Sequence, residues 1–118
     1  MPSDPDTPIR IKFTPTFKRN LRTLAKKYRH IRSDVKPIID QLQSGVVVGD
    51  QVPGVRFAVF KVRIRNQDIQ KGKRSGYRML YYLRSPHSII LIAIYSKLDQ
   101  GDISPRRIRQ IINETQGF

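Results

Sequence analysis

The chain has 118 residues, the length of one domain, and 38 % of them are apolar against roughly 45–50 % in an average soluble domain. Its 23 lysines and arginines against 9 acidic residues give a net charge of +14, more than solubility requires, so we expect a polyanionic partner. The absence of cysteine excludes disulfides, cysteine-ligated zinc and thiol catalysis, and two histidines offer little for a metal site, so we expect no metal and no other cofactor.

The first part of the chain predicts a strand followed by a helix. Residues 1–7 form a loose lead-in without a basic, apolar export signal, so we expect a cytoplasmic protein. Isoleucines alternate with basic residues over 8–13, which is typical of a short strand. Thr14 and Pro15 then supply a helix cap and a first-turn proline, and apolar residues recur every three or four positions up to Ile31.

A second helix is predicted after Ser33. Its apolar residues keep the helical spacing, and Gly45 offers a left-handed stop, so we expect the helix to end near Ser44. The start stays open between Asp34 and Pro37, because proline is favoured at the first helical position and removes a hydrogen bond further in.

Three strands follow in the second half of the chain. Residues 56–65 alternate between apolar and basic side chains, and a long, basic, polar connection at 66–76 leads into a strand at 77–83. Residues 88–95 are apolar on both parities, which is typical of a central strand covered on both faces. This apolar run is far shorter than the about 20 residues that span a membrane, so we expect no membrane partner.

A last helix is predicted from Ser104 and Pro105 to about Asn113, with one narrow apolar edge. The predicted order is therefore strand, helix, helix, three strands, helix. This order predicts an α+β fold in a single domain over residues 1–118, with two N-terminal helices packed on a small antiparallel sheet and one C-terminal helix.

The central strands resemble those of a known family. The stretch Phe60–Arg65, the basic connection after it and Ser75–Tyr82 closely resemble the central strands of RelE/ParE-superfamily toxins. Ile89–Lys97 and Asp102–Ser104 are similar to the HigB branch in particular, and the resemblance covers nearly the whole chain after residue 8. It implies a RelE-like fold and a toxin that cleaves messenger RNA on the ribosome and is held inactive by an acidic antitoxin protein.

The resemblance also implies which residues are catalytic. RelE-type toxins carry catalytic cations on the strand that matches Lys61 and Arg63 and on the arginine that matches Arg78. The sequence departs from the family at Ser104, about where RelE has a tyrosine, and the arginine before that tyrosine falls around 97–98. These departures leave open which residue transfers a proton.

The residues alone also indicate a cationic site. Lys61, Arg63 and Arg65 lie on one face of a strand at intervals of about 6.5–7 Å, close to the phosphate spacing of an extended nucleic-acid strand. A solvated strand edge is the alternative for such a pattern, but the basic connection and Arg78 favour a site. We expect RNA contacts from Arg65, Lys71, Lys73, Arg74, Tyr82, Tyr95 and Lys97.

RNA can be cut without a metal when its own 2′-hydroxyl attacks the adjacent phosphate. Fixed guanidinium groups at Arg63 and Arg78 would neutralise the transition state, and their permanent charge forbids either from acting as a base. Crowding among like charges makes Lys61 the best candidate for proton transfer, with a simple phosphate contact as an equal alternative.

Several residues have a structural interpretation beside the functional one. Tyr82 and Tyr95 either stack on bases or pack in the core. Asp102 and its neighbour Asp99 are interpreted as favouring the dipole of the last helix, and both histidines as surface residues. The alternative function is a non-catalytic one, either a ParE-like gyrase poison or a general nucleic-acid-binding module.

Overall fold

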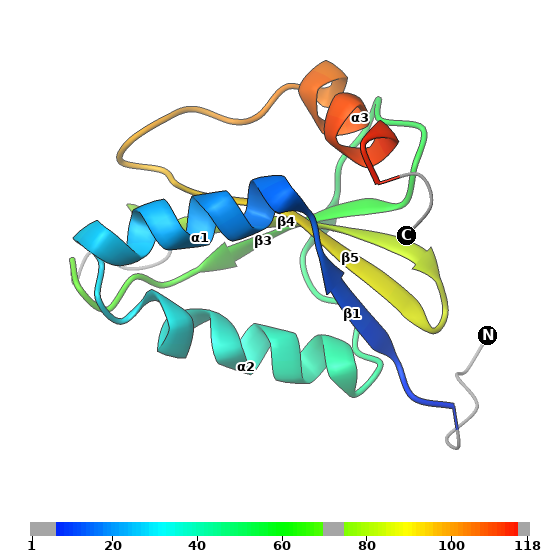
Figure 1. The fold of residues 1–118 in the computed structure, drawn as a ribbon, viewed down its shortest axis with the longest axis horizontal. Coiled ribbons are helices and arrows are strands. Elements are labelled where there is room, and N and C mark those ends of the chain that lie inside the picture. The colour runs from blue at the N-terminus through cyan, green and yellow to red at the C-terminus, as the bar shows by residue number, and fades with distance from the viewer. Residues whose placement is uncertain (1–6, 70–74, 116–118) are drawn as a thin grey trace.

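The structure, a computed structural model, describes residues 7–69 and 75–115. A five-stranded sheet and three helices form the fold (Figure 1), which confirms the predicted α+β class. Most of the predicted lead-in and part of the predicted basic connection lie outside the described residues. In chain order the elements are β1 (Arg10–Phe13), α1 (Pro15–Lys27), α2 (Ile31–Gln43), β2 (Asp50–Gln51), β3 (Val59–Ile64), β4 (Tyr77–Ser85), β5 (Ser88–Ser96) and α3 (Pro105–Asn113).

The sheet is mixed, so the prediction of an antiparallel sheet is correct for β2 to β5 and wrong for β1. The strand order is β1-β5-β4-β3-β2, and β1 runs parallel to β5, with Arg10 opposite Ser88. The other neighbouring strands are antiparallel. Residue alternation shows which side chains share a face, but it does not show the direction of the neighbouring strand. The strand β2 was not predicted, because two residues are too few to show a period.

The first helix begins as predicted and ends earlier. The Thr14 hydroxyl accepts a hydrogen bond from the Phe17 amide at 2.9 Å and donates one to the Ile92 carbonyl at 2.7 Å, which ties the start of α1 to β5. The apolar period predicted a helix up to Ile31, but Tyr28 adopts an extended conformation and ends α1. Tyr28 and Ile31 are both buried, so the spacing of buried apolar residues continues across the turn that joins α1 to α2.

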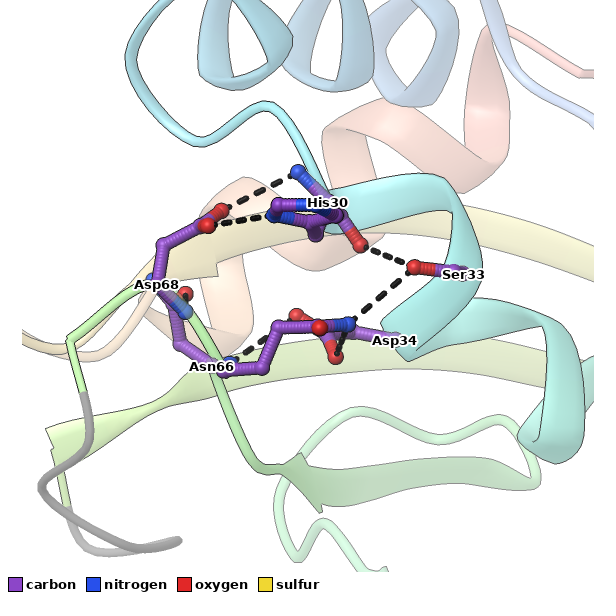
Figure 2. Close-up of polar contacts among 6 residues, drawn as sticks. His30, Ser33, Asp34, Asn66 and Asp68 are labelled. Carbon is purple, nitrogen blue, oxygen red and sulfur yellow. Dashed lines mark hydrogen bonds and ion pairs between the residues drawn. The ribbon is translucent and has the colours of Figure 1, made fainter.

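The second helix begins at Ile31, before the predicted starts, and contains Pro37 in its interior. Its start is fixed by a residue that is distant in the chain. The carboxylate of Asp68 accepts a hydrogen bond from the His30 amide at 3.0 Å and lies 2.6 Å from Nδ1 of the same histidine (Figure 2). Local sequence around Pro37 cannot show this start, because the group that satisfies the helix terminus comes from the segment after β3.

Apolar clusters cover both faces of the sheet. On one face, α1 and α2 pack against the strands and bury Phe17, Leu42 and Tyr81. On the other face, α3 packs through residues such as Ile108 against Leu80 of β4. Since β5 is covered from both sides, it is buried along nearly its whole length, as its apolar pattern predicts.

Candidate nucleic-acid interface

Three basic side chains meet on the sheet face that α3 covers in part. Arg63 of β3 lies directly opposite Arg78 of β4, and Arg78 lies opposite Tyr95 of β5. Directly opposed residues project from the same face of a sheet, with Cβ atoms about 4.5–5.5 Å apart. Lys61 precedes Arg63 by two positions in β3 and projects from the same face. The fold therefore brings the three predicted catalytic cations together.

Two glycines allow β3 to lie close to its neighbours at this site. A Cβ atom on Gly76 would lie 2.1 Å from the Ile64 carbonyl oxygen, and one on Gly49 would lie 2.4 Å from the Lys61 carbonyl oxygen. Gly49 also has a φ of +88°, which other residues rarely adopt. Because Gly76 sets the entry of β4 two residues before Arg78, a larger residue there would displace the strand that carries this arginine.

Arg78 is the most enclosed of the three cations. The residue is 5 % exposed, and its Nη1 donates a hydrogen bond to the Tyr77 carbonyl at 3.2 Å. Burial lowers the pKa of the Arg78 guanidinium, and the charge of Arg63 lowers it further, while Tyr95 and Asp102 act in the opposite direction. A guanidinium stays protonated at neutral pH under such shifts, so Arg78 is a fixed positive charge.

Sequence reasoning missed one member of the site, the carboxylate of Asp102. It accepts a hydrogen bond from the Tyr95 hydroxyl at 2.8 Å and lies 3.5 Å from the ammonium nitrogens of Lys61 and Lys97. These contacts lower the pKa of Asp102, with the Tyr95 hydrogen bond as the largest cause. Ser104, rather than Asp102, caps α3. The signal available in the sequence was that Asp102 follows Tyr95 by seven positions and Lys97 by five in a basic chain.

The second acidic residue of this loop has a different partner. Asp99 forms an ion pair with Lys27 at 2.8 Å, which links the loop after β5 to the end of α1. Both side chains are well exposed to solvent, and such surface pairs contribute little to stability. The partner of Asp99 is therefore at the end of α1 and is none of the cations of the site.

The surroundings of Lys61 differ from those expected. The prediction of a proton-transfer role rested on crowding among like charges, but the Lys61 ammonium faces the Asp102 carboxylate. Its side chain is 32 % exposed, so it remains accessible to a ligand. The two roles predicted for Lys61, proton transfer and a simple phosphate contact, both stay predictions.

Both predicted RNA-binding tyrosines pack in the cluster beneath α3. Tyr95 is 4 % exposed, and Tyr82 is half-buried with its ring edge-to-face against Phe57 at 5.3 Å. Burial, together with the hydrogen bond to Asp102, raises the pKa of Tyr95, so its hydroxyl stays a neutral donor. Stacking on a base needs an open ring face, which Tyr95 does not offer. Its contribution is to hold Asp102 beside the cations.

The remaining predicted RNA contacts border the site or cannot be placed. Lys97 directly follows β5, and its backbone amide donates to the Gly76 carbonyl at 3.0 Å. Arg65 directly follows β3 and is exposed. The other predicted cations lie outside the described residues, namely Lys71, Lys73 and Arg74.

Neither histidine belongs to this site. His30 is exposed at the start of α2, as expected of a surface residue. His87 is half-buried in the turn between β4 and β5, so the surface interpretation holds for it only in part. Within the part of the chain that the structure describes, no three side chains of the metal-binding types gather closely enough to hold an ion.

The described geometry can bind and orient a phosphodiester. The exposed guanidinium of Arg63 offers planar donors that match phosphate oxygens. The buried charge of Arg78 adds to the positive potential beside it, and the ammonium groups of Lys61 and Lys97 extend the positive surface. No family model matches the chain, and no relative is found among curated proteins. None of the helices in the described ranges is long and apolar enough to cross a membrane. The ligand is therefore inferred from the chemistry of the site.

Proposed function

We propose that the chain is the toxin of a toxin–antitoxin pair, a metal-independent endoribonuclease that cleaves messenger RNA on the ribosome in the cytoplasm. The observation that carries the proposal is the register that sets Arg63 opposite Arg78 on one sheet face, with Lys61 beside them. The resemblance to RelE/ParE toxins implies catalytic cations at these same positions. The net charge of +14 supports an RNA substrate and an acidic protein inhibitor.

The proposed reaction uses atoms of the RNA alone as the nucleophile and leaving group. The 2′-hydroxyl oxygen of one nucleotide bonds to the adjacent phosphorus, and the bond from that phosphorus to the next 5′-oxygen breaks. The 2′-hydroxyl loses its proton and the departing 5′-oxygen gains one, which leaves a 2′,3′-cyclic phosphate and a 5′-hydroxyl. Negative charge builds up on the phosphate oxygens, where the guanidinium groups of Arg63 and Arg78 would stabilise it.

The described groups favour charge stabilisation over acid–base chemistry as the main source of acceleration. Asp102 is the carboxylate beside the cations, but its lowered pKa makes it a weak base at neutral pH. Tyr95 has a raised pKa, and its protonated hydroxyl donates a hydrogen bond to Asp102, so it does not serve as a base. The proposed roles are therefore transition-state cations at Arg63 and Arg78 and phosphate contacts at Lys61 and Lys97.

One observation favours the alternative, a non-catalytic nucleic-acid binder or gyrase poison. Arg78 is almost fully buried, and a cation that touches the reacting phosphate needs an open face. A buried Arg78 could instead raise the potential of a surface on which only Arg63 and Lys61 touch the ligand. This alternative predicts binding without strand scission.

The test is to incubate the purified chain with translating ribosomes and to map the ends of the bound messenger RNA. The proposal expects new 5′-hydroxyl and 2′,3′-cyclic phosphate ends within the messenger, absent with an Arg63→Ala/Arg78→Ala variant. An Arg19→Ala/Arg22→Ala variant, which loses the same charge from the outer face of α1, is the control. Intact messenger RNA on arrested or unaffected ribosomes would overturn the cleavage proposal.

The proposed acidic antitoxin has its own test. Expression of the chain alone should arrest translation and growth, and co-expression with the antitoxin should relieve the arrest. Charge complementarity predicts fast association that slows as salt is added. Normal growth and translation on expression of the chain alone would contradict the toxin proposal.

A further inference from the structure

One edge of the sheet is open to a further strand. The strand β1 stands at the end of the strand order and, within the described residues, pairs only with β5 (Figure 1). The amides of Arg10 and Thr14 both donate to carbonyls on the side of β5. Because alternate residues of a strand present their backbone groups to opposite sides, the amide and carbonyl of Ile11 lie on the free edge.

An apolar groove borders this edge, between β1 and α2. A cavity of about 370 Å³ is lined by Ile9, directly before β1, and by Leu42 of α2. A second cavity of about 350 Å³ is lined by Phe13 of β1 and Val35 of α2. Ile11 projects from the same face of β1 between the two cavities and packs against the same apolar cluster. The cavities are therefore about 13 Å apart along the strand, at roughly 3.3 Å per residue.

The groove leaves apolar side chains exposed to solvent. Phe13 is 37 % exposed, although its ring stacks on Phe17 at 5.5 Å. Val46 and Val47, in the loop after α2, are 49 % and 51 % exposed and line the cavity beside Ile9. Exposed apolar residues that gather around a concave surface indicate an interaction site, whereas single scattered ones do not.

Basic side chains border the groove. Arg10 projects from the other face of β1, while Arg32 and Lys36 of α2 line the cavity beside Phe13, and all three are exposed. Lys36 forms an exposed ion pair with Asp40, which contributes little to stability. Neither Arg10 nor Arg32 has an ion-pair partner among the described residues. A segment that fits this groove should therefore carry carboxylates as well as apolar side chains.

Protection against unwanted pairing explains only part of this edge. Short edge strands with basic side chains discourage aggregation, and β1 is short and basic. This charge opposes pairing with a second copy of the chain, because each copy carries +14 and would bring its own Arg10 to the contact. It does not oppose an acidic strand. Edge protection also gives no reason for apolar cavities beside the strand, and those cavities offer nothing to the phosphates of a nucleic acid.

We propose that β1 accepts an extended segment of an acidic protein as a sixth strand of the sheet. Its backbone would pair with the free edge at Ile11, in the manner of strand addition to an exposed sheet edge. Because successive side chains of a strand project to opposite faces, apolar residues at alternate positions would fill the groove, and acidic residues between them would face Arg10. This inference rests on the proposed function, in which that protein is the acidic inhibitor.

The proposed strand would lie away from the candidate interface. The strands β5 and β4 separate β1 from β3, which carries Lys61 and Arg63. The segment would therefore anchor the inhibitor without touching these cations, and a second part of the inhibitor would cover them. The segment by itself and RNA should bind the chain at the same time.

The test titrates the full chain with a synthetic peptide of about nine residues, in which leucines alternate with glutamates, and follows backbone amide resonances. The inference expects shifts at Ile11, Phe13 and Val47 and slower hydrogen exchange of the Ile11 amide. A strand presents alternate amides to its neighbour, so N-methylation at one parity of the peptide should abolish binding and at the other parity should not. Equal binding of the two methylated peptides, or shifts confined to the candidate interface, would overturn the inference.

A matched pair of variants completes the test. Val47→Asp places a negative charge in the groove and should weaken peptide binding at least about tenfold. Leu98→Asp makes the same change at an equally exposed apolar residue after β5 and should keep most of the affinity. Equal losses would show general charge attraction alone and overturn the inference. Growth arrest and cleavage on the ribosome are scored separately, so their absence would remove the proposed function while the peptide still decides the strand site.

Discussion

The two faces of the sheet differ in what covers them and in the polar groups at their margins. Beneath α1 and α2 the covering is almost wholly apolar, and its polar margin joins the start of α2 to the segment after β3 (Figure 2). Beneath α3 the apolar cluster is smaller and gives way to Lys61, Arg63 and Arg78. One face thus supplies stability, and the other carries charge that a stable core does not need.

A carboxylate at each margin shows the same contrast. Asp68 binds His30, and the neighbouring Gln67 donates to Asp34 at 2.8 Å, so this margin is a network of paired groups. Asp102 has Lys61 and Lys97 beside it in a region of excess positive charge. The first carboxylate completes a structural contact, whereas the second leaves most of the positive charge available to a ligand.

The largest expected effect is on the face beneath α1 and α2. Leu91 is fully buried there, and Leu91→Ala should lower the free energy of unfolding by about 2–5 kcal/mol, because it removes packing and leaves a cavity. Chemical denaturation followed by circular dichroism measures the loss. RNA affinity of the fraction that stays folded should not change. A loss well below this range would contradict the division between the two faces.

Arg78→Ala tests the other face. If Arg78 is a transition-state cation, cleavage should slow by at least about 10²-fold while ribosome association stays nearly intact. Arg78→Lys should rescue poorly, since an ammonium cannot reproduce a planar two-point contact. Arg22→Ala on the outer face of α1 is the control. A stable Arg78→Ala protein that cuts at the parent rate would exclude the residue from the site.

Asp102→Asn should distinguish an effect on the positions of Lys61 and Lys97 from an effect on RNA binding. The change removes a negative charge from a cationic surface, so RNA affinity should stay equal or rise, while cleavage should slow by about tenfold as Lys61 and Lys97 lose their common partner. Rate and affinity are measured in the same ribosome assay. Weaker RNA binding at an unchanged cleavage rate would contradict this role.

The same variant makes a prediction about pH. The pKa of Asp102 is lowered in the folded state, so the ionised carboxylate stabilises the fold above its unfolded pKa of about 3.9, and this contribution is lost as the pH falls through the folded pKa. The midpoint temperature of thermal unfolding should therefore fall less steeply between about pH 5 and pH 2 for Asp102→Asn than for the parent. Parallel curves would show that the Tyr95 and lysine contacts do not form in solution.

The smallest effect is expected at the paired margin. Asp68→Asn keeps an acceptor for the His30 amide but removes a carboxylate whose pKa is lowered mainly by its hydrogen bond to His30. Its thermal midpoint should fall by less than that of Leu91→Ala, and cleavage should match the parent. A loss of cleavage in folded Asp68→Asn would show that the two faces are coupled.

Sequence patterns predicted the elements whose signals are local. The alternation in β3, the two-sided apolar run of β5 and the Ser104 cap of α3 all lie within a few residues of the structure they specify. The start of α2 could not be predicted in this way, because Asp68 supplies its capping group from across the fold. The parallel pairing of β1 also depends on a distant strand.

The candidate site was also predictable only in part. Lys61, Arg63 and Arg78 could be named from alternation and from the family resemblance, and the register brings them together. Asp102 was not assigned to the site, because its partners become neighbours only when the loop after β5 folds over the sheet face. The burial of Tyr95 likewise follows from the packing of α3, which a strand pattern does not contain.

In the proposed reaction, the cationic face orients messenger RNA for attack by its own 2′-hydroxyl. The most direct measurement uses ribosomes that carry a defined messenger with a single 2′-deoxy nucleotide at the mapped cleavage position. Replacing that hydroxyl with hydrogen should abolish the cut at this position and leave ribosome association of the chain unchanged. Cleavage of the deoxy messenger at the parent rate would exclude this mechanism.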